Sequence, residues 1–150
     1  MRNAIATIGI SAVLAAFLAV GVVAASAADH EVQMLNRGAE GLMVFEPALV
    51  RVQPGDTVNF ISVDKGHNVE SIAGTIPEDI EPFRGPISKD FSITFDKPGL
   101  YGYKCTPHFA MGMVGLVVVG DASVDVVPAA GVRLPRKAEQ RFDAIFANLQ

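Results

Sequence analysis

Residues 101–119 read YGYKCTPHFAMGMVGLVVV, and this stretch predicts two strands and the loop that joins them. Tyr101, Tyr103 and Cys105 alternate with Gly102 and Lys104, a period of two that places side chains on one face of a strand. The apolar run at residues 114–119 is typical of a buried strand. The loop between them holds the only cysteine of the chain. One segment therefore indicates both the fold class and a chemical site.

The residues before this segment repeat the strand signal. Phe91, Ile93 and Phe95 alternate with polar residues, and a further strand is expected at residues 58–63, which read VNFISV. Pro-Gly pairs at residues 54–55 and 98–99 mark turns. Short strands separated by turns predict an all-β sandwich or barrel. Residues 71–89 contain three prolines, so we expect a long connection there, with room for a helical turn.

The tail of the chain changes to a helical period. Pro135 stands where a first helical residue would be expected. A shorter helix is predicted at residues 123–127. The domain prediction is a sandwich at residues 28–122 and a helical extension at residues 123–150 that packs on it. Apolar residues spaced by three and four predict the amphipathic helix over residues 137–149: Ala138, Phe142, Ile145, Phe146 and Leu149.

The N-terminus has the pattern of an export signal. Arg2 is followed by an uncharged, largely apolar run that extends to Asp29, and the small residues at 25–27 suit cleavage. The sequence therefore predicts a cleaved signal at residues 1–27. The alternative is an uncleaved membrane anchor, because the uncharged run is long enough to span a bilayer. Cleavage leaves 123 residues, enough for one domain with its own core and without a membrane segment.

Net charge and cysteine content limit the possible partners and the possible roles of the cysteine. The formal charge of −4 becomes −5 without Arg2, which argues against nucleic acid as a partner. A single cysteine in an oxidising compartment is either buried and inert, paired between chains, or chemically employed. We expect a monomer, because no feature of the sequence indicates an obligate oligomer.

The loop offers soft metal ligands at the spacing C-x2-H-x4-M, which are Cys105, His108 and Met113. His67 follows a predicted strand and a turn, so it is the expected second imidazole, whereas His30 is expected to be solvated near a frayed terminus. Two imidazoles, a thiolate and a weak axial thioether are the ligands of a blue-copper electron-transfer site. Met111 is the alternative axial ligand. Four protein ligands leave no open position for a substrate, which predicts a carrier and not an enzyme.

The chain resembles the cupredoxins, the type 1 blue-copper family, and most of all the pseudoazurin branch with its helical tail. The resemblance covers residues 28–150. It implies a Greek-key β-sandwich, one copper ion and the ligand set His67, Cys105, His108 and Met113. It also implies that Asn68 ties the two ligand loops together and that Pro107 removes a backbone donor to the thiolate. The residues that carry the resemblance are Phe45-Glu46-Pro47, Pro54-Gly55-Asp56-Thr57-Val58, Asp64-Lys65-Gly66-His67-Asn68 and Lys104-Cys105-Thr106-Pro107-His108.

The resemblance also implies a periplasmic carrier whose partners are copper nitrite reductase and c-type cytochromes. The electron would pass through the edge of His108, and a basic ring around it would steer acidic partners. The expected docking residues are Lys65, Lys104, Met111, Arg37 and Arg84.

Two other functions use the same residues. A copper-binding or delivery protein would need the same ligands without rapid electron transfer. A cysteine hydrolase would use Cys105, His67 and Asn68 as thiolate, imidazole and amide. The hydrolase lacks the papain-type signature around its cysteine and leaves His108 and Met113 without a role.

Overall fold

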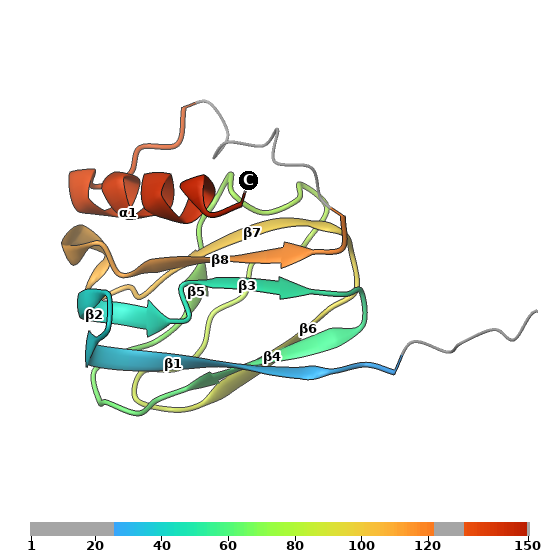
Figure 1. Ribbon diagram of the computed structural model, residues 1–150, viewed down its shortest axis with the longest axis horizontal. Helices are drawn as coiled ribbons and strands as arrows, with labels where there is room; N and C mark the ends of the chain where they lie inside the picture. The colour runs from blue at the N-terminus through green and yellow to red at the C-terminus, as the bar shows by residue number, and fades with distance from the viewer. Residues whose placement is uncertain (1–25, 122–130, 150) are drawn as a thin grey trace, which may run out of the picture.

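The computed structural model describes residues 26–121 and 131–149. Within these residues two four-stranded sheets lie face to face, and the helix α1 (Arg136–Ala147) covers the outer face of the second sheet (Figure 1). The first sheet has the order β2-β1-β4-β6: β1 is Asp29–Gly38, β2 Gly41–Glu46, β4 Asp56–Ile61 and β6 Phe91–Phe95. The second has the order β3-β8-β7-β5: β3 is Leu49–Val52, β5 Glu70–Ser71, β7 Gly99–Lys104 and β8 Val114–Val119.

The connections make this a Greek-key sandwich. Every connection from β2 to β7 crosses from one sheet to the other, whereas β7 and β8 are antiparallel neighbours in one sheet. The pairs β1-β4 and β3-β8 are parallel, and the other strand pairs are antiparallel. The predicted all-β sandwich is therefore confirmed.

Aromatic side chains fill the space between the sheets. The ring of Tyr103 lies edge-on to Phe45 and Phe60, with centroid distances of 4.8 and 5.1 Å. Edge-on pairs of this kind contribute about 0.5–1.5 kcal/mol beyond the area that they bury. Tyr103 also lies across Gly115, its partner in the β7-β8 ladder, where any side chain would collide with the ring. This contact explains why a glycine interrupts the apolar run of β8.

A second apolar layer lies between α1 and the outer face of the β7-β8 pair. It explains why all six residues of β8 are buried, because the sandwich covers one face and the helix the other. The predicted docking of the tail helix is confirmed, but the helix begins at Arg136, and Pro135 is its N-cap residue. The buried members of this layer are Leu100, Val114, Leu116, Val118, Ala138, Phe142, Ile145 and Leu149, among others.

One local prediction was wrong. His30 lies within β1 opposite Val58, and its Nε2 is 2.9 Å from a carboxylate oxygen of Asp56, so it is neither frayed nor fully solvated. Residues 72–90 form the expected long connection, which contains turns and one residue of an isolated bridge but no helical turn. Residues 1–25 of the predicted signal and the predicted helix at 123–127 lie outside the described residues. No helix in the described part of the chain is long and apolar enough to cross a membrane.

The carboxylate of Asp56 joins β1 to the turn before β4. It accepts hydrogen bonds from the backbone N–H groups of Ala28 and Gln53, both at 2.8 Å, and it pairs with His30. These bonds lower the pKa of Asp56 from 3.8 to about 2, the backbone bond from Ala28 contributing most. A carboxyl whose pKa is lower in the folded state stabilises the protein fully above its unfolded pKa.

We therefore expect the stability from Asp56 to be complete above about pH 4 and lost as the pH falls through about 2. Urea denaturation of the metal-free protein at pH 6 and pH 2.5 measures this loss. Asp56→Asn should unfold more easily at pH 6 and should lose less stability on acidification. An equal loss in both proteins would contradict the prediction.

Candidate metal centre

Three potential metal ligands converge at one end of the sandwich. The distance from Cys105 Sγ to Nδ1 is 3.7 Å for His67 and 3.4 Å for His108, and the two Nδ1 atoms lie 3.0 Å apart. Cys105 and His67 are fully buried, whereas His108 is partly exposed. Three of the four predicted ligands thus present their donor atoms to a common point.

The loop that follows β7 folds back on itself. The Cys105 N–H donates to the Met113 carbonyl at 3.0 Å, and the Met113 N–H donates to the His108 carbonyl at 3.2 Å. A short 3-10 helix, η1 (Phe109–Met111), fills the loop and ends at Gly112 in the left-handed conformation, with φ of 89°. Met113 is fully buried in the same apolar cluster as Cys105, whereas Met111 is 42% exposed. Burial therefore favours Met113 over Met111 as the fourth ligand.

Asn36 orients the imidazole of His67. Its Oδ1 lies 3.0 Å from His67 Nε2, and because a carbonyl oxygen only accepts, Nε2 carries the proton and Nδ1 keeps its lone pair. The Asn36 backbone N–H in turn donates to Asp64 Oδ2 at 2.6 Å. Sequence reasoning missed Asn36, which is 31 residues from His67 and belongs to no local motif. Partners of this kind set the tautomer and direction of a metal ligand.

The side chain of Asn68 joins the His67 loop to the Cys105 loop. Its Oδ1 accepts from the Thr106 N–H at 2.8 Å, and its Nδ2 donates to Thr106 Oγ1 at 3.3 Å and to the Gly85 carbonyl at 3.4 Å. These bonds have the geometry of the predicted tie between the loops.

The protonation states suit metal binding. Burial, together with the neighbouring His108, lowers the pKa of His67, so its imidazole stays neutral. Burial raises the pKa of the Cys105 thiol, and hydrogen bonds from the backbone N–H groups of Asn68 and His108 act in the opposite direction. A bound cation would displace the thiol proton. Pro107, which precedes His108, has no backbone N–H and so cannot donate a hydrogen bond to the sulfur.

The donor set fits a copper ion. Two ligands held at about 2.0–2.3 Å from one metal lie roughly 3–4 Å apart, which matches the three distances between donor atoms. A thiolate favours Cu(I), and imidazole accepts both oxidation states. The residues present therefore suit a metal that cycles between these two states.

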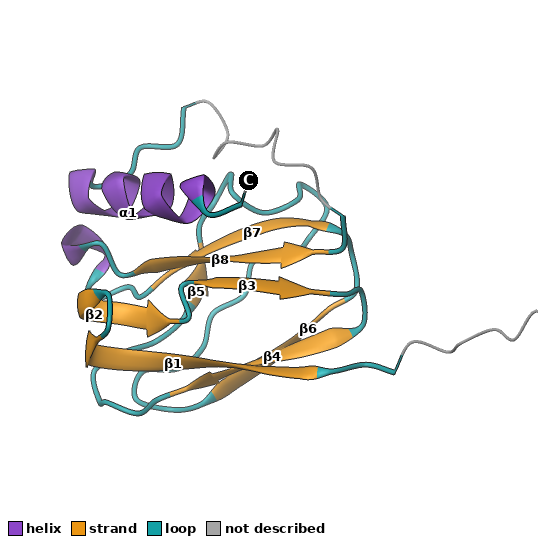
Figure 2. Cartoon of the chain, viewed as in Figure 1, coloured by secondary structure: helices purple, strands orange, loops and turns teal. Residues whose placement is uncertain are grey.

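The helix α1 supports the ligand loop from outside. Figure 2 shows η1 next to the first turn of α1, and the two are in contact. A Cβ atom at Gly112 would lie 2.8 Å from the Lys137 carbonyl oxygen, so a glycine is needed for this approach. On the same helix, Arg141 Nη1 donates to the Met43 carbonyl at 3.1 Å. Met43, which has a φ of 50°, packs partly buried against the cluster that contains Cys105 and Met113.

The predicted docking residues differ in whether their charged groups are free to contact another protein or are already paired. Lys65 and Arg37 are exposed, and the Lys65 ammonium lies 3.4 Å from the Ser88 carbonyl. Arg84 and Lys104 both form ion pairs with Glu70, a residue that sequence reasoning did not consider. Their contribution to a basic surface is therefore smaller than their number suggests.

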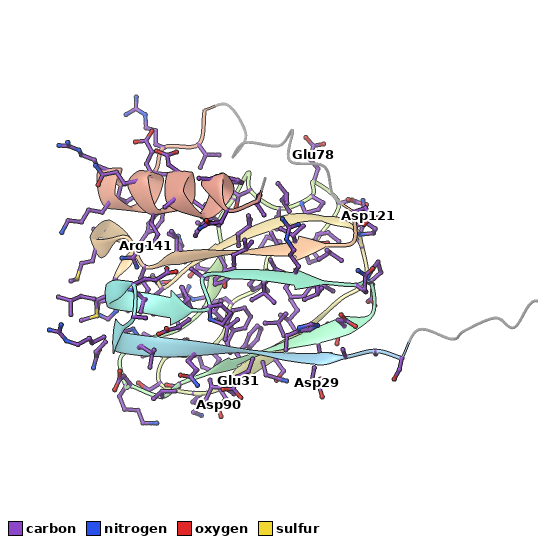
Figure 3. All side chains as sticks on the ribbon, in the orientation of Figure 1. Asp29, Glu31, Glu78, Asp90, Asp121 and Arg141 are labelled. Atoms are coloured by element: carbon purple, nitrogen blue, oxygen red, sulfur yellow. The ribbon has the colours of Figure 1, made fainter. Side chains whose placement is uncertain are left out.

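Figure 3 places Arg141 beside η1, at the end of the molecule that holds the ligand loop, and places Glu78 and Asp121 at the opposite end.

Comparisons with known proteins identify relatives along nearly the whole described chain. Residues 32–120 match the copper binding proteins of the plastocyanin/azurin family. A pseudoazurin from Paracoccus pantotrophus is 54% identical over 123 residues, covering 82% of this chain and 85% of the relative. A pseudoazurin from Methylorubrum extorquens is 43% identical over 141 residues, covering 92% and 95% of the two chains. The crystal structure of pseudoazurin from Methylobacterium extorquens AM1 superposes with a TM-score of 0.76 at 45% identity, covering 81% of this chain and 99% of that one.

Asn36→Ala is expected to weaken copper binding about 10- to 100-fold, because His67 would lose the partner that fixes its tautomer. The dissociation constant, measured by competition with a chelator of known affinity, tests this. The control is Gln33→Ala, since this exposed side chain on the same strand bonds to Glu31 at the surface and, among the described residues, forms no hydrogen bond with His67. Binding by Asn36→Ala within twofold of the wild-type protein would contradict the role of Asn36.

Asn68→Ala is expected to lower the free energy of unfolding of the metal-free protein by about 1–3 kcal/mol, because the Thr106 N–H would lose its partner. Urea denaturation measures the change. Asn59→Ala is the matched control, because Asn59 bonds to Ser92 at the surface, and it should cost no more than about 0.5 kcal/mol. Equal losses in the two variants would argue against a tie between the loops.

Proposed function

Because this chain belongs to the plastocyanin/azurin family of copper binding proteins, we propose that it is a blue-copper one-electron carrier that acts in the periplasm. Its ligands would be His67, Cys105, His108 and Met113. The observation that carries the proposal is the convergence of two Nδ1 atoms and a buried sulfur within 4.8 Å, from loops that Asn68 joins by hydrogen bonds. The exposed Met111 would not be a ligand.

When bound there, copper supplies one electron that is gained and lost reversibly, as Cu(I) and Cu(II) interconvert. The protein's contribution is to keep the donor atoms still during that change. Asn36 holds the direction of His67, and the Cys105–Met113 backbone bond closes the loop around His108. A site that rearranges little on electron transfer has a low activation barrier, so each transfer is fast.

The exposed side of His108 is the proposed route for the electron. His108 is the one of the three convergent ligands that is not fully buried, and Met111 provides an exposed apolar surface in the same loop. A small contact of this kind suits a brief encounter between redox proteins. Lys65, Arg37 and Arg84 would steer an acidic partner to this end.

The proposed partners are a copper nitrite reductase as electron acceptor and c-type cytochromes, with the carrier acting as a monomer. Support comes from the relatives that are named pseudoazurin and from the basic residues near the ligand loop. Export by a cleaved signal at residues 1–27 would deliver the chain to the periplasm.

Two alternatives fit the geometry less well. A delivery protein needs ligands that exchange readily, whereas Cys105 and His67 are fully buried and held between two joined loops. A cysteine hydrolase needs an accessible thiol oriented by its partners. Here Cys105 is fully buried, and the side chain of Asn68 bonds to Thr106 and Gly85.

The oxidised copper protein is expected to show an intense blue absorption band that ascorbate bleaches and that Cys105→Ser lacks. The physical reason is that the band arises from charge transfer between the thiolate and Cu(II). Met111→Leu is the control, and it should keep both the band and the reduction potential. If the wild-type protein bound copper without the band, electron transfer would fail as the function and copper delivery would replace it.

A further inference from the structure

Glu70 is the centre of a polar cluster beside the ligand loop. Its Oε2 accepts a hydrogen bond from the Thr106 hydroxyl at 2.7 Å and lies 3.3 Å from Arg84 Nε. Its Oε1 lies 3.7 Å from Lys104 Nζ. One carboxylate therefore serves three donors, and one of them, Thr106, follows Cys105 directly in the chain.

The sheet register places these side chains together. Glu70 of β5 is paired with Lys104 of β7, and an isolated bridge joins Glu70 to Arg84. Side chains opposite each other on neighbouring strands point to the same face, so the acid has a base on either side. The cluster is thus built into the backbone pairing that carries the ligand loop.

The two cations of the cluster are presented differently. The side chain of Lys104 is only 22% exposed, and its ammonium lies 5.0 Å from the centre of the Phe109 ring, within cation–π range. The side chain of Arg84 is 65% exposed, and its Nε faces Glu70. Within the described residues, its two terminal nitrogens form no ion pair, so they can receive a carboxylate from another molecule.

We propose that Glu70 is a specificity-determining residue of the electron-transfer face. It cancels one of the two positive charges beside the ligand loop, holds Lys104 inward and leaves Arg84 as the outward contact. This inference rests on the proposed function as an electron carrier. The partner that fits is a redox protein that brings carboxylates to this face, attracted by one net charge from the cluster instead of two.

Removing the charge of Glu70 tests the inference without removing its shape. Glu70→Gln keeps an oxygen that can accept from Thr106, but the cluster then carries two net positive charges. An added charge raises the encounter rate with anions and lowers it with cations, and salt suppresses both effects. A change in the copper potential would instead move the rates of two similar oxidants in the same direction.

The experiment is stopped-flow oxidation of the reduced copper protein by two reagents, followed at the blue band. Ferricyanide is an anion and cobalt tris(phenanthroline) is a cation, and each accepts one electron from Cu(I) to leave Cu(II). At about 10 mM salt, Glu70→Gln should raise the ferricyanide rate about two- to fivefold and lower the rate with the cobalt reagent. The ratio of the two rates should return toward the wild-type value at about 500 mM salt.

Two further variants decide whether charge is the cause. Glu78→Gln removes an exposed carboxylate at the opposite end and should leave the ratio unchanged. The double variant Glu70→Gln with Arg84→Gln restores the net charge of the cluster and should return the ratio close to that of the wild-type protein. An unchanged ratio in Glu70→Gln, or an equal change in Glu78→Gln, would overturn the inference alone. A wild-type copper protein that neither reagent oxidises would overturn the carrier function and the inference with it.

Discussion

The side chain of Asn68 joins two loops that leave different sheets. The His67 loop follows β4 in the first sheet, and the Cys105 loop follows β7 in the second. Distances of 3.0–3.7 Å between donor atoms require these loops to keep one separation, although the His67 loop itself crosses between the sheets and two further crossings separate β5 from β7. Packing of the aromatic core sets the distance between the sheets. The hydrogen bond between the Asn68 side chain and Thr106 then fixes the distance between the loops that carry His67 and Cys105.

The expected copper ligands differ in their exposure to solvent. Cys105, His67 and Met113 are fully buried, which limits exchange of a bound metal and reaction of the thiol with solvent. His108 is partly exposed in a loop that also presents Met111. The basic residues near the loop differ in the same way. Glu70 neutralises part of the positive charge nearest the loop, whereas Lys65 and Arg37 stay exposed. The proposed route for electrons, through His108, is therefore separate from the buried ligands, which limit the access of metal and solvent.

Local patterns predicted the features that depend on neighbours in sequence. The alternation at residues 91–95, the apolar run of β8 and the helical period of the tail all correspond to observed elements. Features that depend on distant partners were not predictable from one sequence. The bond between His30 and Asp56 spans 26 residues, and the bond between Asn36 and His67 spans 31. The ion pairs of Arg84 and Lys104 with Glu70 were missed for the same reason, because they depend on the bridge between Glu70 and Arg84 and on the pairing of β5 with β7.

The close approach of Gly112 to Lys137 means that the ligand loop and the tail are not independent modules. A side chain at position 112 would meet the backbone of α1, which cannot move aside without leaving the apolar layer beneath it. A loop taken from a relative that lacks such a helix would be compatible here only with a glycine at this position and the same left-handed turn. The ligand loop and the first turn of α1 are therefore expected to evolve together. A substitution on one side of this contact is expected to require a compensating substitution on the other.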